Sequence, residues 1–192
     1  DRPFFQALLF LTIWTLLTSI AHPFYSYVML DVLHMSYSSV SVVTIVQRIA
    51  SIASFLIWGN LAARYSNRTL LLWTLPIVAL SCLVWGGIAF MPDLPVMIAV
   101  HILLGFGLGA YAQVVFIFVI GDTPKAERPM YIAVFSAITG LAGFLGPMAG
   151  GYVFEAFKGA HDWVESYGII TITGVVLLLL ASVAGPVAFK ER

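Results

Sequence analysis

The chain has 192 residues, of which 61% are hydrophobic and only 9% are charged, and its formal net charge at pH 7 is zero. Because so few polar side chains cannot cover the surface of a water-soluble globule, the composition excludes a soluble enzyme and predicts a membrane protein. The only cysteine, Cys82, lies within an apolar run, and a single cysteine excludes an internal disulfide bond.

Six apolar runs predict an all-α polytopic membrane protein, in which six transmembrane helices form one domain of residues 1–192. Each run is long enough to cross a hydrocarbon core of about 30 Å. The expected spans are residues 4–33, 36–63, 69–90, 96–121, 130–157 and 164–189.

The first run carries polar and aromatic side chains at helical spacing. Trp14, Thr18, His22 and Tyr25 share one face of the expected helix. We expect this face to line a cavity, where the aromatic rings could stack on a sugar or pack within the bundle. Pro23 removes one backbone hydrogen bond, so a kink is expected in this part of the helix.

The second run places an arginine deep in the membrane. Arg48 lies about 12 residues into the run, or about 18 Å along a helix. An arginine at this depth costs at least about 2.5 kcal/mol on insertion scales, so we expect it to face a wet cavity or protein rather than lipid. There it would bind an anionic or polyhydroxyl solute, or pair with a carboxylate of another domain. The alternative is a structural hydrogen bond to carbonyl groups at a helix end.

The fourth run carries His101, Gly105, Gly109 and Gln113 on one face, which is also expected to border the cavity. Gln113 is a candidate for hydrogen bonding either to a solute or to a neighbouring helix. For His101 and His22, a proton-carrying role competes with a structural hydrogen bond to a neighbour. The third and sixth runs are almost entirely aliphatic, so we expect them to face lipid.

The fifth run is rich in small residues that permit close approach between helices. The candidates for this packing role are Gly146, Pro147, Gly150 and Gly151. The run therefore predicts a tight contact with a neighbouring helix.

The basic residues are unevenly divided between the loops. Apart from Arg48, all but one lie at the termini and in the second and fourth loops; these are Arg2, Arg64, Arg68, Lys125, Arg128, Lys190 and Arg192. The exception is Lys158 in the fifth loop. By the positive-inside rule, both termini are expected in the cytoplasm, in a multi-pass protein of a bacterial-type inner membrane or plasma membrane.

The loop after the second run, residues 59–68, resembles a signature of the major facilitator superfamily of transporters, which has a glycine, then Asp-Arg, then Gly-x-Arg. The residues that match are Gly59, Arg64 and Arg68. Ala63 stands in place of the acidic residue and Ser66 in place of the glycine. The resemblance implies that this loop takes part in gating.

A second stretch resembles a later pattern of the same family. It consists of the loop from Asp122 to Arg128, followed by Gly146-Pro147-Met148-Ala149-Gly150-Gly151. By this resemblance Asp122 and Arg128 join the candidates for a gating role. The pattern is associated with antiporters in the family, but the same residues also serve as a bend and a packing face, so it does not establish exchange.

The resemblance covers the whole chain as six helices, which is half of the twelve usual in the family. Because a degraded first signature is commoner in the second half of such proteins, we interpret the chain as helices seven to twelve. The family architecture implies that the first and fourth helices line the transport path, the second and fifth meet the other half, and the third and sixth face lipid. These are the positions that the polarity of the runs predicts.

The leading functional hypothesis is half of a secondary transporter, or permease, that moves a small polar or amphipathic solute by alternating access. Its expected partners are the N-terminal six-helix half of the same transporter, the solute and the lipid bilayer. A self-pairing half-size transporter and a non-transporting assembly or signalling module are the alternatives. No enzyme motif, metal site, cofactor or nucleic-acid partner is expected, and the GFGLG segment of the fourth run lacks the preceding strand of a nucleotide-binding loop.

Overall fold

The structure is a computed structural model that describes residues 2–91 and 94–189, with only the backbone described for residues 2 and 3. Within these residues, six helices are long and apolar enough to cross a membrane. The expectation of an all-α, six-helix membrane protein is therefore confirmed.

The spanning helices follow one another along the chain with short connections. They are α1 (Arg2–Tyr27), α2 (Tyr37–Ala62), α3 (Asn67–Gly87), α4 (Leu94–Gly121), α5 (Arg128–Phe157) and α6 (Ile169–Val183). Three single turns extend them: the π-helical η1 (Val28–Val32) after α1, the 3-10 turn η2 (Ile88–Phe90) after α3 and the π-helical η3 (Val164–Gly168) before α6. Serine caps start α2 and α3, since the hydroxyls of Ser36 and Ser66 each accept a backbone N–H bond at 3.2 Å.

The last apolar run is interrupted, although the sequence predicted one helix over residues 164–189. α6 ends at Val183, and a separate short helix, α7 (Gly185–Ala188), follows it. Pro186 explains the break, because proline has no N–H to donate and its ring clashes with a carbonyl group of the preceding turn.

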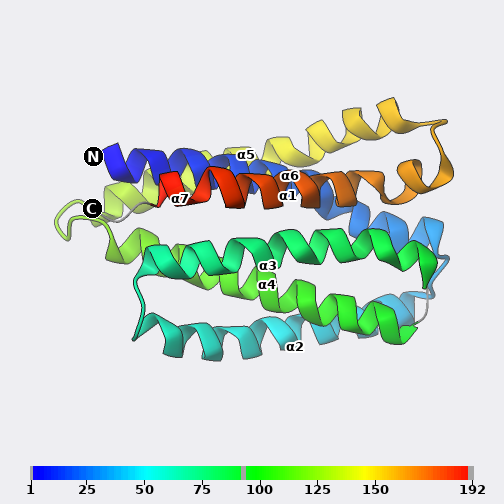
Figure 1. Cartoon of the computed structure of the whole chain (residues 1–192), viewed down its shortest axis with the longest axis horizontal. Helices are drawn as coiled ribbons and strands as arrows, with labels where there is room; N and C mark the ends of the chain where they lie inside the picture. Colours follow the sequence, from blue (N-terminus) through cyan, green and yellow to red (C-terminus); the bar gives the residue numbers. More distant parts are fainter. Residues whose placement is uncertain (1, 92–93, 190–192) are drawn as a thin grey trace.

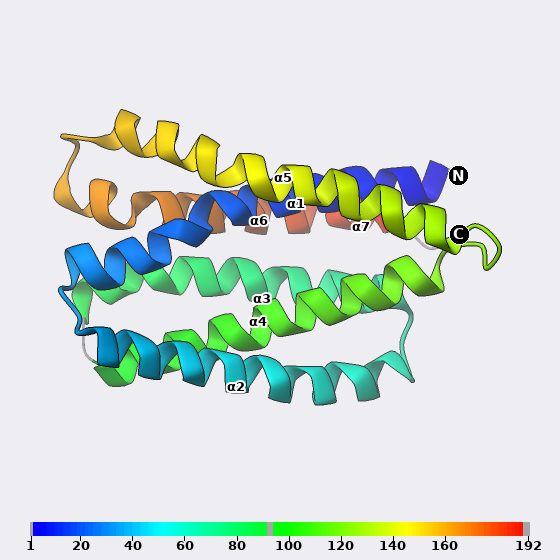
Figure 2. The ribbon, with the colours of Figure 1, turned by 180° about the vertical axis from the view of Figure 1, so that it is seen from behind.

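The six helices form two groups of three (Figure 1). In one group α1 packs against α5 and α6, and in the other α4 packs against α2 and α3, while α3 and α6 join the groups. The view from behind shows the same division (Figure 2). α2 and α5 therefore lie at the open edges, where only 11% of the most apolar stretch of each helix is buried.

α3, which was expected at the lipid-facing periphery, keeps one exposed face but is the most buried of the six spans. Its most apolar stretch is 56% buried, the highest share among the six spans, because it packs against both α4 and α6. Leu71, Leu75 and Val78 lie in the core on this side. The outer face of α3, which carries the exposed Trp73, Leu80 and Val84, is left for lipid.

The start of α1 and the end of α7 lie at the same end of the bundle as the α2–α3 and α4–α5 loops (Figure 1). This end carries the described basic residues Arg64, Arg68, Lys125 and Arg128, and we call it the basic end. Lys158 lies at the opposite end. The side chain of Arg2, and residues Lys190 and Arg192, which the sequence argument also used, lie outside the described residues.

Candidate solute-binding site

The guanidinium of Arg48 lies on the open surface of α2. Arg48 is close to the middle of this 26-residue helix, and its side chain is exposed. It makes no hydrogen bond and no ion pair with any described residue. A cationic group at this depth in a membrane requires water or a polar partner. The described bundle supplies no such partner, and the exposed guanidinium lies on its outer surface.

A cavity lies on the face of α2 that carries Arg48. Phe55 is seven residues after Arg48, so the two side chains share one face of the helix. Phe55 lines a cavity of about 450 Å³ together with Ala112, Gln113 and Phe116 of α4. The predicted residues Arg48 and Gln113 therefore belong to the same α2–α4 flank, about two helical turns apart along the bundle axis.

Gly59 leaves room for the side chain of Gln113 in this flank. A Cβ atom on Gly59 would lie 3.1 Å from Nε2 of Gln113, so the amide occupies space that another residue at position 59 would restrict. Oε1 of Gln113 is buried and has no hydrogen-bond partner among the described residues. An unpaired buried acceptor carries a desolvation cost of about 1–3 kcal/mol, which a donor on a solute or a water molecule would relieve.

Three of the predicted residues of α1 line a second, smaller cavity. This space of about 90 Å³ lies between α1, α3 and α4; its lining residues are Thr18, Ser19, His22, Tyr25, Val78, Cys82 and Leu108. The hydroxyl of Tyr25 lies 3.1 Å from Sγ of Cys82. Thr18 donates to the carbonyl of Trp14 at 2.9 Å. The volume is enough for a few water molecules, at about 30 Å³ each, but not for a solute.

Trp14 and His101 lie in the core of the bundle. Trp14 is fully buried, and its ring lies between Phe10 and Tyr111, with centroids 6.0 Å from each. His101 is 1% exposed, and its Nδ1 lies 2.8 Å from the carbonyl oxygen of Met97. Neither side chain lines the two cavities described above. In this bundle their geometry is that of packing residues.

Gly105 and Gly109, which we expected to border the cavity, face α2 instead. A Cβ atom on Gly105 would collide with the carbonyl oxygen of Gln47, and one on Gly109 would lie 2.6 Å from Oγ of Ser51. Ser54 adds a hydrogen bond of 2.8 Å across the same contact, to the carbonyl of Phe106. The small residues thus allow α2 and α4 to pack backbone against backbone.

The small residues of α5 are divided between two faces. A Cβ atom on Gly146 would lie 2.8 Å from the carbonyl oxygen of Leu16, and one on Gly150 would lie 2.9 Å from that of Ile20, so both glycines contact α1. Pro147 and Gly151 are exposed. A Cβ atom on Gly151 would meet no described atom within 4 Å. Half of the predicted packing set therefore faces outward, on an edge helix.

Two of the predicted gating residues contact each other at the basic end. Nε of Arg68 lies 3.1 Å from Oδ2 of Asp122, and Asn67, which the sequence did not indicate, donates to Oδ1 of Asp122 at 2.9 Å. Arg64 is exposed in the loop between α2 and α3. Arg128 is partly buried at the start of α5, and its Nε has no partner among the described residues.

The described residues contain no group of three or more His, Cys, Asp or Glu side chains that could bind a metal ion.

A comparison with protein families matches residues 4–191 to the model of the Major Facilitator Superfamily. Comparisons with curated proteins and with solved structures gave no match. Because the family model covers nearly all of the chain, the protein belongs to the major facilitator superfamily, of which it presents one six-helix bundle.

Proposed function

We propose that this bundle is one half of a secondary transporter that moves a small polar or amphipathic solute by alternating access. The observation that carries the proposal is the exposed guanidinium of Arg48, near the middle of a membrane span and without a partner among the described residues. A wet, solute-sized space between this bundle and a second one would satisfy that charge.

The edges of the bundle fit pairing with a second six-helix half. α2 and α5 are the two least buried spans. Both helices expose large apolar residues, such as Ile52 of α2 and Phe144 of α5, and α5 also exposes the small residues Gly140 and Gly151. Both glycines have open space where a Cβ atom would lie, which suits close approach of another helix.

We infer that the chain corresponds to the C-terminal half, with both termini in the cytoplasm. Ala63 and Ser66 replace the acid and the glycine of the loop signature, and such a degraded copy favours the second half. The basic end, with Arg64, Arg68, Lys125 and Arg128, supports a cytoplasmic assignment in a bacterial-type inner or plasma membrane. Pairing with a second copy of this chain would use the same α2 and α5 faces.

The test is water access to position 48 in the complete protein. Arg48→Cys in a Cys82→Ser background is labelled with a charged, membrane-impermeant methanethiosulfonate reagent, in vesicles of both orientations. Alternating access predicts labelling from each side. Val175→Cys, on the exposed aliphatic face of α6, is the matched control and is expected not to react.

Each alternative gives a different labelling result. Reaction of Arg48→Cys from one side only would contradict alternating access and favour a non-transporting module. No reaction from either side would remove the cavity assignment of Arg48. Disulfide cross-linking between two Gly151→Cys chains would show self-pairing instead of pairing with a different half.

A further inference from the structure

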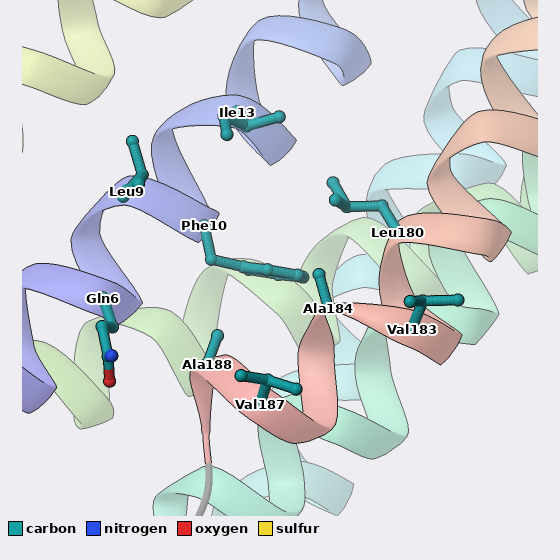
Figure 3. Close-up of a pocket in the computed structure, with 9 residues that line it drawn as sticks. All are labelled: Gln6, Leu9, Phe10, Ile13, Leu180, Val183, Ala184, Val187 and Ala188. Carbon is teal, nitrogen blue, oxygen red and sulfur yellow. The ribbon is translucent and has the colours of Figure 1, made fainter.

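Another apolar hollow lies on a different side of the bundle from the Arg48 face. It is a groove of about 390 Å³ at the basic end, lined by Gln6, Leu9, Phe10, Ile13, Leu180, Val183, Ala184, Val187 and Ala188 (Figure 3). Gln6 is the only one of these residues with a polar side chain. We propose that this groove between α1, α6 and α7 holds an acyl chain of a phospholipid from the adjoining membrane leaflet.

The break after α6 creates the groove. Figure 3 shows Phe10 reaching from α1 toward Ala184, which lies between α6 and α7, and it shows Ala188 at the end of α7. Because both alanines are small, the space between α1 and α7 is not filled. A Cβ atom on Gly185 would lie 3.1 Å from the side chain of Leu72 of α3, so this glycine allows the start of α7 to lie close to that side chain. Phe10, only 4% exposed, forms the floor.

The surface that continues from the groove along α6 is apolar and suited to lipid. Along α6 the exposed large residues are all aliphatic: Ile172, Val175, Val176, Leu178, Leu179 and Val183. The groove extends this surface to the basic end through Val183 and Val187. In a membrane this side meets hydrocarbon, and a dry apolar hollow beside hydrocarbon gains dispersion contacts when a chain fills it. Water is disfavoured there because it needs two to four polar partners.

The length of the groove along the bundle axis fits within one leaflet. Its α1 residues, Gln6 to Ile13, cover about 10 Å along the helix axis, which is less than half of a hydrocarbon core of about 30 Å. A similar apolar hollow of about 430 Å³ lies at the opposite end of the bundle, between Val84 of α3 and the first turns of α4, with Ala99 and Leu103. The two hollows lie at opposite ends of the bundle, so each would take an acyl chain from a different leaflet.

The proposal can be tested with a phosphatidylglycerol that carries a diazirine in its acyl chain, incorporated into bilayers with the complete protein. After irradiation, mass spectrometry locates the adducts. An acyl chain held in the groove predicts several-fold more adducts on the peptides of Ile13 and Val183 than on those of Val175 and Leu179, which are exposed on α6 outside it. Ala184→Phe fills the groove and is expected to abolish the excess, whereas Val176→Phe is expected to keep it.

Contact with ordinary boundary lipid would label the four positions to the same extent, and that result would overturn the proposal. So would adducts that join Ile13 to another polypeptide, since the groove would then belong to a protein interface. If Ala184→Phe fails to fold, the comparison of positions in the unaltered protein still decides the question. The outcome is independent of solute transport, because the groove and the Arg48 face are on different helices.

Discussion

Asp122, just after α4, accepts hydrogen bonds from two consecutive residues at the start of α3: Arg68 at 3.1 Å and Asn67 at 2.9 Å. One carboxylate thus fastens two helices at the basic end, with each of its oxygens used by a different donor. The carboxylate and the guanidinium are about a quarter exposed. The contact is therefore partly screened by water, and its contribution is expected to be moderate.

We predict that Asp122→Asn lowers the stability of the complete protein by about 1 kcal/mol, since it removes the ion pair but keeps one acceptor oxygen. The measurement is the melting temperature of the purified protein in detergent. Glu127→Gln is the matched control, because Glu127 is exposed and its side chain has no partner among the described residues. Equal melting temperatures for the two variants would show that the contact does not fasten the helices.

We predict that Gly105→Ala destabilises the protein by about 1–3 kcal/mol, the usual cost of forcing an added methyl group into a packed contact. The methyl group would collide with the backbone carbonyl of Gln47, which cannot rotate away as a side chain can. Gly87→Ala is the control, because a Cβ atom there meets nothing within 4 Å. The two melting temperatures decide the point, and a tolerated Gly105→Ala would mean that α2 and α4 are less closely packed than described.

The sequence was sufficient to predict the six helices, but not to predict what the polar faces of these helices contact. Length and hydropathy define a membrane span without reference to the rest of the chain. By contrast, glycines at helical spacing suit a cavity wall as well as a helix contact, and only the position of α2 assigns Gly105 to the contact. Trp14 and His101 were equally ambiguous, because an amphipathic ring can line a cavity or fill a core.

The structure differs from the sequence-based expectation at two further places, the end of α6 and the contact of Asn67. The expected helix over residues 164–189 overlooked Pro186, although this proline is a local signal that a helix stops, and α6 ends before it. The role of Asn67 was not visible, because its partner Asp122 is 55 residues away. For Arg48 the position within an apolar run was enough, because a charge deep in a membrane needs water or a polar partner whatever its neighbours are.

We predict that Arg48→Ala weakens solute binding or uptake about ten- to a hundredfold, because a hydrogen bond to a charged group contributes about 1.5–3 kcal/mol. Arg48→Lys keeps the positive charge but lacks the planar guanidinium with its several donors, so it is expected to retain part of the solute binding or uptake that Arg48→Ala loses. Ile49→Ala, at a neighbouring exposed position, is the control. The measurement is uptake into proteoliposomes of a panel of anionic and neutral polyhydroxyl solutes. Unchanged uptake by Arg48→Ala would end the site assignment.

The cavity between α1, α3 and α4 gives the last prediction, which concerns Cys82. This thiol is 2% exposed and lies 3.1 Å from the hydroxyl of Tyr25, so it should react slowly with a small charged methanethiosulfonate reagent. Tyr25→Ala removes the ring from the cavity wall and should raise the labelling rate severalfold if the cavity opens to water. Tyr27→Ala is the control, because Tyr27 packs against Phe154 and does not line this cavity. An unreactive Cys82 in Tyr25→Ala would place this face of α1 away from the aqueous path, even if Arg48 proves to border it.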